Sequence, residues 1–397
     1  MDGPGFLAAH NEINVAVPTH TVEFDDNGWN AALAALQVND RRPLLRLVQA
    51  DPVLRHEAFH HYLQLTNFHA WARELSRYEA TYIASVPLAA YLSGRPYCIF
   101  SVGGDLQVDC GRGDGFGQAM SVAFNAGRFL MISNPHAVGH SRRLGLTNGV
   151  YLPYPMDDHR YSPGHGEARA RWVARCGEGT YVLATARIDH KVKGIDDSYI
   201  DALAAAAQRE PSLRFVFLTW GHDAQAFRQR VMALPVAHQF LLLEPVGKRR
   251  LVDYYRSCDV VLDQMVYGYF GATALEAASV GKPLVMRLRQ EQYASFYQGD
   301  TAPVCTVDSP AAVRDTLVSL AQSPEKRRQL GDDMRAWLVR HHGRERTLPL
   351  LLSMLRVAAD QVKLPPELVS PLLEPLSQEE LSYHRSCLIT EPVKASR

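Results

Sequence analysis

The chain has 397 residues, of which 47% are hydrophobic and 21% are charged, and its 42 basic and 42 acidic residues give a formal net charge of +0. This length favours two domains, the composition is typical of a globular protein, and the balanced charge argues against nucleic acid as a partner. No apolar run approaches the ~20 residues that span a bilayer, and the first residues lack signal-peptide features, so we expect a cytoplasmic protein without a transmembrane segment.

Cysteine and histidine give no sign of a metal site. The six cysteines have no paired spacing, and Cys98 and Cys258 lie inside apolar runs, as buried free thiols do. This pattern indicates a reducing compartment and no zinc site. The histidines between positions 56 and 69 do not form a His-Glu-x-x-His motif, so a surface histidine cluster is favoured over a metal site. No bound metal is expected.

The first part of the chain gives a weak pattern and then a clear one. Up to residue 78 the apolar spacing predicts a short strand at 13–17 and helices at 29–36, 43–49 and 56–78. Beyond it, strands are predicted at 81–86, 97–102 and 128–133, with helices ending near Leu92 and Leu144, and residues 149–153 close this half.

Two glycine-containing loops lie in this half. Gly103, Gly104 and Asp105 follow the strand at 97–102, at the carboxyl end where open parallel sheets bind ligands. The glycine-rich loop at 111–117 does not follow a strand directly, so a mobile loop is favoured over a dinucleotide-binding loop.

In the second half strands and helices alternate. A polar segment at 157–169, with proline and glycine, predicts a linker. Beyond it the strands are expected at 181–186, 213–219, 240–244, 259–263 and 284–287, and the helices at about 195–209, 223–234, 248–257, 271–280, 309–321 and 325–341. This alternation predicts a parallel sheet covered on both faces, and therefore an α/β protein with two Rossmann-like halves. A last helix is predicted at about 345–361.

The stretch from Tyr267 to Val285 follows a buried strand and carries a distinctive helix. Gly268 and Gly271 allow a tight turn, and small residues at the start of the helix let an anion approach its backbone N–H groups. Glu276 lies one turn further along. The combination suggests a site for a phosphate joined to a sugar hydroxyl, although from this stretch alone a plain strand–helix turn with core alanines is an equal alternative.

Three other strand ends carry groups of the same kind. Arg187, Lys193 and Gly194 follow the strand at 181–186, where cations are suited to a diphosphate; a solvated basic loop is the alternative. Gly221 follows the next strand, and the backbone at Val246, after the third, is placed to meet a flat base.

In this order, these pieces resemble the donor-binding half of GT-B glycosyltransferases of the retaining family 4 type, also called glycosyl transferases group 1. The resemblance runs from about Tyr97 to His342. It is carried by Arg187 with Lys193 and Gly194, by the run 247–263, and by 270–285. Two further segments look like parts of the family pattern, Tyr151–Asp157 and Gly103–Asp105.

The resemblance implies a GT-B architecture with two Rossmann-like parallel-sheet domains facing across a cleft. Residues 1–156 would form the acceptor side, 157–345 the nucleotide-sugar-binding domain, and 346–397 a helix that crosses back and a tail. The implied activity is transfer of a sugar from a nucleotide diphosphate sugar to an acceptor hydroxyl, with retention of anomeric configuration, without a metal or a further cofactor. The acceptor would be a glycan, a lipid-linked or a small molecule, as in polysaccharide biosynthesis, with the enzyme in the cytoplasm or peripheral at the inner membrane face.

The resemblance also implies roles for particular residues. Arg187 and Lys193 would be catalytic, because they stabilise the charge of the departing diphosphate. Glu276 would accept hydrogen bonds from ribose hydroxyls. The donor-binding residues implied are Gly104, Asp105, Gly194, Gly221, Val246, Gly268, Phe270, Gly271, Ala272, Thr273 and Glu276.

The sequence departs from the family pattern at three places. A glutamate expected eight positions before Glu276 is replaced by Gly268. Asp263-Gln264 resembles an Asp-Gln…Gly variant of the family's Glu-x7-Glu motif, so Asp263 or Gln264 is the candidate substitute. The loop position that holds a histidine in the family is Val102 here. His136 is its candidate substitute, and a helix-start histidine satisfied by local hydrogen bonds is an equal alternative. The usual opening strand and glycine loop are not recognisable. These departures support an alternative, a degenerate GT-B protein that binds a nucleotide sugar or glycan, or acts as a partner subunit, without catalysis.

Overall fold

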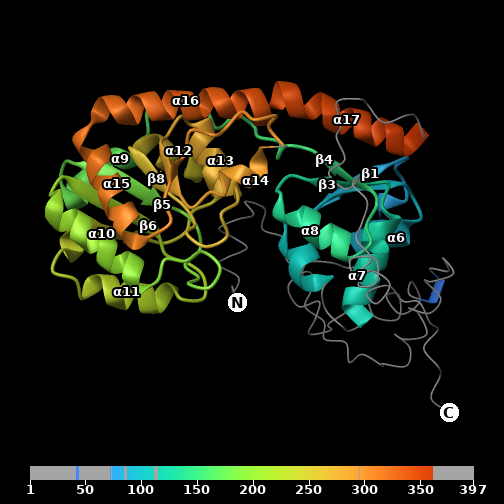
Figure 1. Cartoon of the computed structure of the whole chain (residues 1–397), viewed down its shortest axis with the longest axis horizontal. Coiled ribbons are helices and arrows are strands. Elements are labelled where there is room, and N and C mark those ends of the chain that lie inside the picture. The colour runs from blue at the N-terminus through green and yellow to red at the C-terminus, as the bar shows by residue number, and fades with distance from the viewer. Residues whose placement is uncertain are drawn as a thin grey trace, which may run out of the picture. The chain divides into compact units, whose positions relative to one another are not determined.

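The computed structural model describes residues 42–43, 72, 74–84, 87–110, 115–294 and 296–360. The strand predicted at 13–17 and the helix predicted at 29–36 lie outside these residues, as do nearly all of the helices predicted at 43–49 and 56–78. The described residues form two compact units, Pro155–Arg346 and, separately, the residues up to Tyr154 together with those from Thr347 (Figure 1).

The unit that contains the earlier residues is built on a four-stranded parallel sheet in the order β1-β2-β3-β4. Every residue of β2 and β3 is buried, as in parallel strands covered on both faces. The strands are β1 Thr81–Ala84, β2 Tyr97–Phe100, β3 Phe129–Ile132 and β4 Gly149–Tyr151, and the helices are α6 Pro87–Ser93, α7 Gly115–Ala126 and α8 His136–Arg143.

A helix from the far end of the described chain completes this unit. α17, Arg344–Asp360, contributes Met354 and Val357 to a core that also holds Cys98 and Phe100. Burying such side chains stabilises the fold by about 1.5–3 kcal/mol each, so α17 is an integral part of this sheet's cover.

The Pro155–Arg346 unit is built on a six-stranded parallel sheet in the order β10-β9-β8-β5-β6-β7. Its core is apolar and aromatic, with Phe215 and Phe240 stacked at 4.7 Å between ring centroids. The strands are β5 Thr180–Ala184, β6 Leu213–Leu218, β7 Phe240–Leu243, β8 Val260–Leu262, β9 Leu284–Met286 and β10 Cys305–Thr306.

The strand order reverses direction beside β5. The chain runs outward from β5 through β6 to β7, and then returns to place β8 on the other side of β5. Because parallel crossovers are right-handed, this reversal puts the helices after β5 and β6 on one face and those after β7 and β8 on the other (Figure 1). The helices are α10 Asp197–Arg209, α11 Ala224–Met232, α12 Lys248–Ser257, α13 Ala272–Ser279, α15 Pro310–Gln322 and α16 Pro324–His342.

Sequence patterns located all the major elements of this unit but missed α9 Ala168–Cys176, α14 Gln290–Tyr293 and β10. Only Ala168 and Trp172 of α9 are buried, so the helix has little apolar period to detect. The segment before it was predicted as a linker, yet it is held against α12. Arg256 donates to the Ser162 carbonyl at 2.9 Å, and the Asp253 carboxylate accepts from the Glu167 N–H at 2.5 Å.

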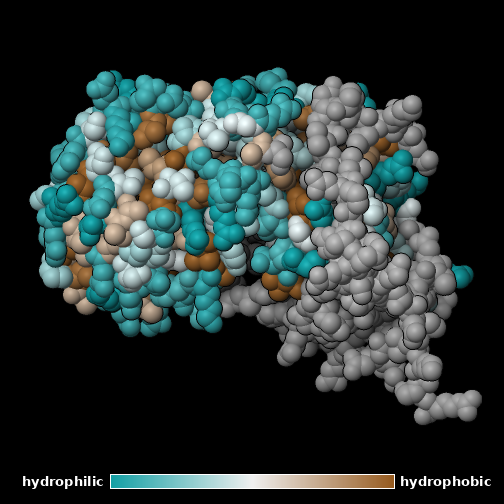
Figure 2. All heavy atoms as spheres, in the orientation of Figure 1, coloured by the Kyte–Doolittle hydropathy of each residue, from teal (hydrophilic) through white to brown (hydrophobic). Residues whose placement is uncertain are grey.

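Among the described helices, none has both the length and the apolar character required to cross a membrane. On the face that Figure 2 shows, apolar residues of the Pro155–Arg346 unit are scattered among hydrophilic ones. Single exposed apolar side chains of this kind are ordinary for a protein surface.

Candidate functional site

The carboxyl ends of β5 and β8 lie next to each other where the strand order reverses. The two strands pair directly, with Val182 opposite Val260 and Leu183 opposite Val261. Open α/β sheets bind their ligands at such a switch point, because the loops that leave the two strands diverge and leave a crevice. The loop after β5 carries Arg187, and the loop after β8 leads to α13, so both predicted groups belong to this one edge.

The basic loop after β5 carries two cations, Arg187, which lies near a carboxylate, and Lys193, which does not form an ion pair in the described residues. The Arg187 Nε lies 3.6 Å from the Asp189 carboxylate and the side chain is 43% exposed. Lys193 is half-buried, and its ammonium forms no ion pair with the described residues. The Lys193 carbonyl accepts the Met265 N–H at 2.7 Å, which ties this loop to the loop after β8. The ammonium of Lys193 is therefore available to an anion at the switch point.

Two predicted glycines allow these loops to pack closely. Gly194 has φ of 81°, and a Cβ there would lie 2.4 Å from Cγ2 of Val266. Gly221 has φ of 102°, and a Cβ there would lie 2.7 Å from the Ile188 carbonyl oxygen. Glycine is required at both positions by conformation and by space. Val246 lies half-buried in the turn between β7 and α12, on the same edge of the sheet.

The helix α13 begins at the switch point with no side chain capping it. Its N-cap is Gly271, and Gly271, Ala272 and Thr273 are each half-buried. The Thr185 hydroxyl at the end of β5 donates to the Thr273 hydroxyl at 3.4 Å, which sets the helix against β5. Uncapped N–H groups and the helix dipole favour an anion here by about 0.3–1 kcal/mol.

Glu276 is buried and held by two side chains that the sequence analysis did not single out. Its carboxylate accepts from the Lys248 ammonium at 2.5 Å and from the Tyr255 hydroxyl at 2.9 Å. Burial, with Glu276 beside it, raises the pKa of Tyr255 well above its usual value, so the hydroxyl stays protonated and donates. Both carboxylate oxygens retain lone pairs for a further donor. The only signal for Lys248 in the sequence was its place in the run 247–263, which resembles part of the family pattern.

Gly268 and Phe270 occupy different surroundings. Gly268 has φ of 75°, and a Cβ would lie 2.7 Å from Cγ of Arg289, so the position has no room for a larger residue unless Arg289 moves. Phe270 is 5% exposed, its N–H donates to the Tyr293 hydroxyl at 2.9 Å, and its ring lies 5.5 Å from that of Trp337. Phe270 therefore anchors the loop in an aromatic cluster.

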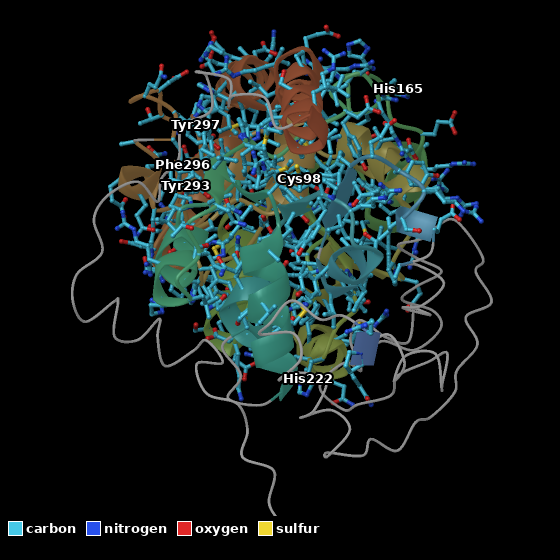
Figure 3. All side chains as sticks on the ribbon, turned by 90° about the vertical axis from the view of Figure 1, so that its right-hand side faces the viewer. Cys98, His165, His222, Tyr293, Phe296 and Tyr297 are labelled. Atoms are coloured by element: carbon cyan, nitrogen blue, oxygen red, sulfur yellow. The ribbon has the colours of Figure 1, made fainter. Side chains whose placement is uncertain are left out.

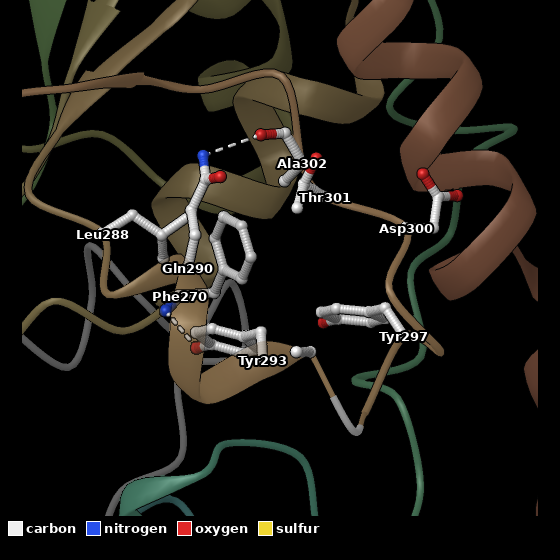
Figure 4. Close-up of a pocket in the computed structure, with 9 residues that line it drawn as sticks. Phe270, Leu288, Gln290, Tyr293, Tyr297, Asp300, Thr301 and Ala302 are labelled. Atoms are coloured by element: carbon white, nitrogen blue, oxygen red, sulfur yellow. Dashed lines mark hydrogen bonds between the residues drawn. The ribbon is translucent and has the colours of Figure 1, made fainter.

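That aromatic cluster encloses a small cavity. Tyr293, Phe296 and Tyr297 lie together, and the rings of Tyr293 and Tyr297 are stacked 5.6 Å apart (Figure 3). Tyr293 and Tyr297, but not Phe296, line a cavity of about 10 Å³ together with Phe270 and Asp300 (Figure 4), which is room for about one water molecule. The cavity is a packing feature and not a ligand site.

In the other unit, the loop after β2 uses its own aspartate. The Asp105 carboxylate is fully buried and accepts hydrogen bonds from the Ser101 hydroxyl and from backbone N–H groups of Val102, Gly103 and Leu106, at 2.6–3.2 Å. Asp105 thus fixes the loop. No atom lies within 4 Å of where a Cβ on Gly104 would be, so the space beside Gly104 is open.

His136 lies beside this loop. Its Nε2 is 3.1 Å from where a Cβ on Gly103 would be. Burial, with His140 close by, lowers the pKa of His136 to about 4, so the imidazole is neutral at neutral pH. This places the predicted substitute histidine next to the loop, as a neutral hydrogen-bonding group.

The described residues contain no group of three or more His, Cys, Asp or Glu side chains arranged to hold a metal ion. The described cysteines are free, and burial raises the pKa of Cys98 and of Cys258 to about 12, which makes them poor nucleophiles.

Comparison with known proteins points to one class. Residues 171–337 match the family Glycosyl transferases group 1. HepE of Anabaena, solved in complex with UDP and glucose, superimposes with a TM-score of 0.58 at 14% identity, over 84% of this chain and 98% of that one. At this identity the likeness shows the fold alone. The chain thus has the GT-B fold of two Rossmann-like domains, and residues 171–337 resemble the group 1 glycosyltransferases.

Two curated relatives match part of the chain. The D-inositol 3-phosphate glycosyltransferase of Corynebacterium efficiens is 25% identical over 181 residues, 44% of this chain and 42% of that protein. The mannosylfructose-phosphate synthase of Agrobacterium fabrum is 30% identical over 146 residues, 34% of this chain and 32% of that protein. Each match spans less than half of the relative's length.

Proposed function

We propose that this protein transfers a sugar from a nucleotide diphosphate sugar to an acceptor hydroxyl, with retention of anomeric configuration and without a metal ion. The observation that carries the proposal is the convergence of Arg187, Lys193, the start of α13 and Glu276 on one switch point, inside the segment that matches the group 1 family. Residues 157–345 would hold the donor, and residues 1–156 would form the acceptor side.

The charges suit a departing diphosphate. Its negative charge grows as the bond to the sugar breaks, so groups that stabilise that charge lower the barrier. Lys193, with its ammonium directed to no partner in the described residues, and Arg187, only loosely paired with Asp189, supply positive charge without a metal. The backbone N–H groups of Ala272 and Thr273 add fixed dipoles at the same edge.

Glu276 suits the ribose. Its carboxylate is already oriented by Lys248 and Tyr255, and it can accept further hydrogen bonds from a pair of neighbouring hydroxyls. HepE has been solved with UDP and with UDP-glucose, so UDP-sugars are the first donors to test. The acceptor would be a glycan, a lipid-linked or a small molecule.

A second candidate is a GT-B protein that binds a nucleotide sugar without catalysis. Gly268, closed off by Arg289, favours it, because the carboxylate that the family pattern places there is absent.

One experiment separates the two. The protein is mixed with UDP-, GDP-, ADP- and dTDP-sugars and a panel of acceptors, and both the thermal shift and the release of nucleotide are measured. Transfer predicts a thermal shift and nucleotide release with the same donor, and Glu276→Ala should lose both. A shift without release over the whole acceptor panel would leave the binding protein as the better account.

A further inference from the structure

Beside the proposed diphosphate site lie three buried oxygen atoms with no hydrogen-bond donor. Asp263 follows the last residue of β8 and is 1% exposed, and neither carboxylate oxygen has a partner in the described part of the chain. Gln264 is 3% exposed. Its amide nitrogen donates to the Tyr269 carbonyl, which fixes the amide, and its Oε1 also lacks a partner there.

Burying a hydrogen-bond acceptor without a donor destabilises the folded state. A buried polar atom without a partner destabilises a fold by about 1–3 kcal/mol, and a carboxylate by more. Burial raises the pKa of Asp263, and the nearby charge of Glu276 raises it further. The positive charge of Lys193 and the adjacent Gln264 N–H lower this pKa and so oppose the rise. The Gln264 N–H nevertheless falls short of hydrogen-bond geometry. Folding alone therefore gives no reason for an aspartate at this position.

The surroundings of Asp263 locate these oxygens next to the phosphate groups proposed above. A Cβ on Gly271, the N-cap of α13, would lie 4.0 Å from Oδ2 of Asp263. The Met265 N–H holds the Lys193 carbonyl at 2.7 Å, which brings the lysine loop to the same strand end. A group attached to a phosphate between Lys193 and α13 would thus come within reach of Asp263.

The chemistry of the oxygens selects the group. A phosphate is itself an acceptor and carries negative charge, so it cannot satisfy a carboxylate. A sugar offers several hydroxyl donors on adjacent carbons, and a carboxylate next to an amide oxygen can accept from more than one of them. Glu276 has less capacity for the transferred sugar, because each of its oxygens already accepts from a side chain and its remaining lone pairs are assigned to the ribose.

We propose that Asp263, together with the Oε1 of Gln264, binds the hydroxyls of the transferred sugar and so determines which sugar the donor carries. The inference rests on the proposed function. Asp263 takes the place of a carboxylate at position 268, where φ is 75° and a Cβ would lie 2.7 Å from Cγ of Arg289, so that one fits only if Arg289 moves. The sugar is thereby held from the strand end and not from the loop.

The test compares UDP with UDP-glucose by titration calorimetry in the full chain. The ratio of the two affinities measures the sugar's own contribution. Asp263→Asn should leave UDP affinity within about twofold and reduce the sugar's contribution by roughly ten- to hundredfold, because hydrogen bonds to a charged group are lost. The thermal midpoint of the variant without ligand should be equal to or above that of wild type, because an unpaired buried carboxylate has been removed.

Asp259→Asn is the matched control, at the residue before β8 as Asp263 is at the residue after it. Asp259 accepts from Arg169 and from the Tyr181 N–H, both at 2.8 Å, so its loss should lower the thermal midpoint and leave the sugar's contribution unchanged. If Asp263→Asn keeps the sugar's contribution, or lowers the midpoint as Asp259→Asn does, Asp263 is a structural residue and the inference is wrong. If wild type binds none of the UDP-, GDP-, ADP- and dTDP-sugars of the panel, it is the proposed function that fails.

Discussion

Two aspartates in this molecule follow parallel strands and are equally buried, yet they have opposite surroundings. Asp105, after β2, is satisfied by donors of its own loop. Asp263, after β8, meets no donor in the described residues. Burial raises the pKa of both carboxyl groups. The difference indicates that one aspartate builds its loop, whereas the other is kept for a ligand, and that burial alone does not distinguish the two.

The largest effect is expected at the cation beside Asp263. Lys193→Ala should reduce the rate of nucleotide release by about 10²–10³, the magnitude typical of losing one group that stabilises developing charge. Lys191→Ala is the matched control, because Lys191 lies in the same loop but is exposed. Steady-state kinetics with the active donor checks this, and equal losses in the two variants would mean that the loop acts only through its overall charge.

Next in size is the isosteric pair Asp105→Asn and Asp263→Asn. Asp105→Asn puts an amide group against backbone N–H donors, so we expect a loss of about 2 kcal/mol in the free energy of unfolding. Asp263→Asn should not lower the free energy of unfolding. Urea unfolding of both variants measures the difference, and similar losses would remove the distinction between the two aspartates.

A smaller effect tests whether position 268 is closed. Gly268→Ala and Gly299→Ala both place a side chain at positive φ, 75° and 83°, which destabilises by about 1–2 kcal/mol. Only Gly268 also has a close neighbour, Cγ of Arg289 at 2.7 Å, whereas nothing lies within 4 Å of a Cβ on Gly299. Gly268→Ala should therefore be the more destabilising of the two in urea unfolding. Equal losses of unfolding free energy in the two variants would show that the Arg289 side chain moves aside, and that a carboxylate at position 268 is sterically possible.

The smallest effect is on pH dependence. Because the folded-state pKa of Asp263 is raised above its usual 3.8, the folded state binds the proton more tightly than the unfolded chain. The stability from this group is complete below pH 3.8 and is lost as the pH rises through the raised pKa. The free energy of unfolding of Asp263→Asn, minus that of wild type, should thus increase from acid to neutral pH. A constant difference would contradict the buried, unpaired carboxylate.

The sequence predicted most of the larger unit and much less of its site chemistry. Alternating strands and helices are local patterns, so β5 to β9 and the long helices were found, while α9 was missed because only Ala168 and Trp172 of it are buried. Arg187, Lys193 and the start of α13 were found because each follows a strand. The order that sets β8 beside β5 is a tertiary property and came only from the structure.

Side-chain pairing could not be predicted for the same reason. The resemblance implies that Asp105 binds the donor, and this stays a prediction; the sequence did not show that backbone N–H groups of the same loop donate to its carboxylate. The pair of Lys248 and Glu276 joins residues 28 positions apart on different helices. The hints in the sequence that Asp263 matters were Gly268 and the likeness of Asp263-Gln264 to a variant of the family motif.

The most direct measurement is a crystal structure of the protein with the nucleotide sugar that gives the largest thermal shift. The account predicts the diphosphate between Lys193 and the first N–H groups of α13, the ribose at Glu276, and sugar hydroxyls within about 3 Å of the Asp263 carboxylate. A nucleotide sugar bound away from the β5–β8 switch point, or one whose sugar leaves Asp263 without a donor, would contradict it.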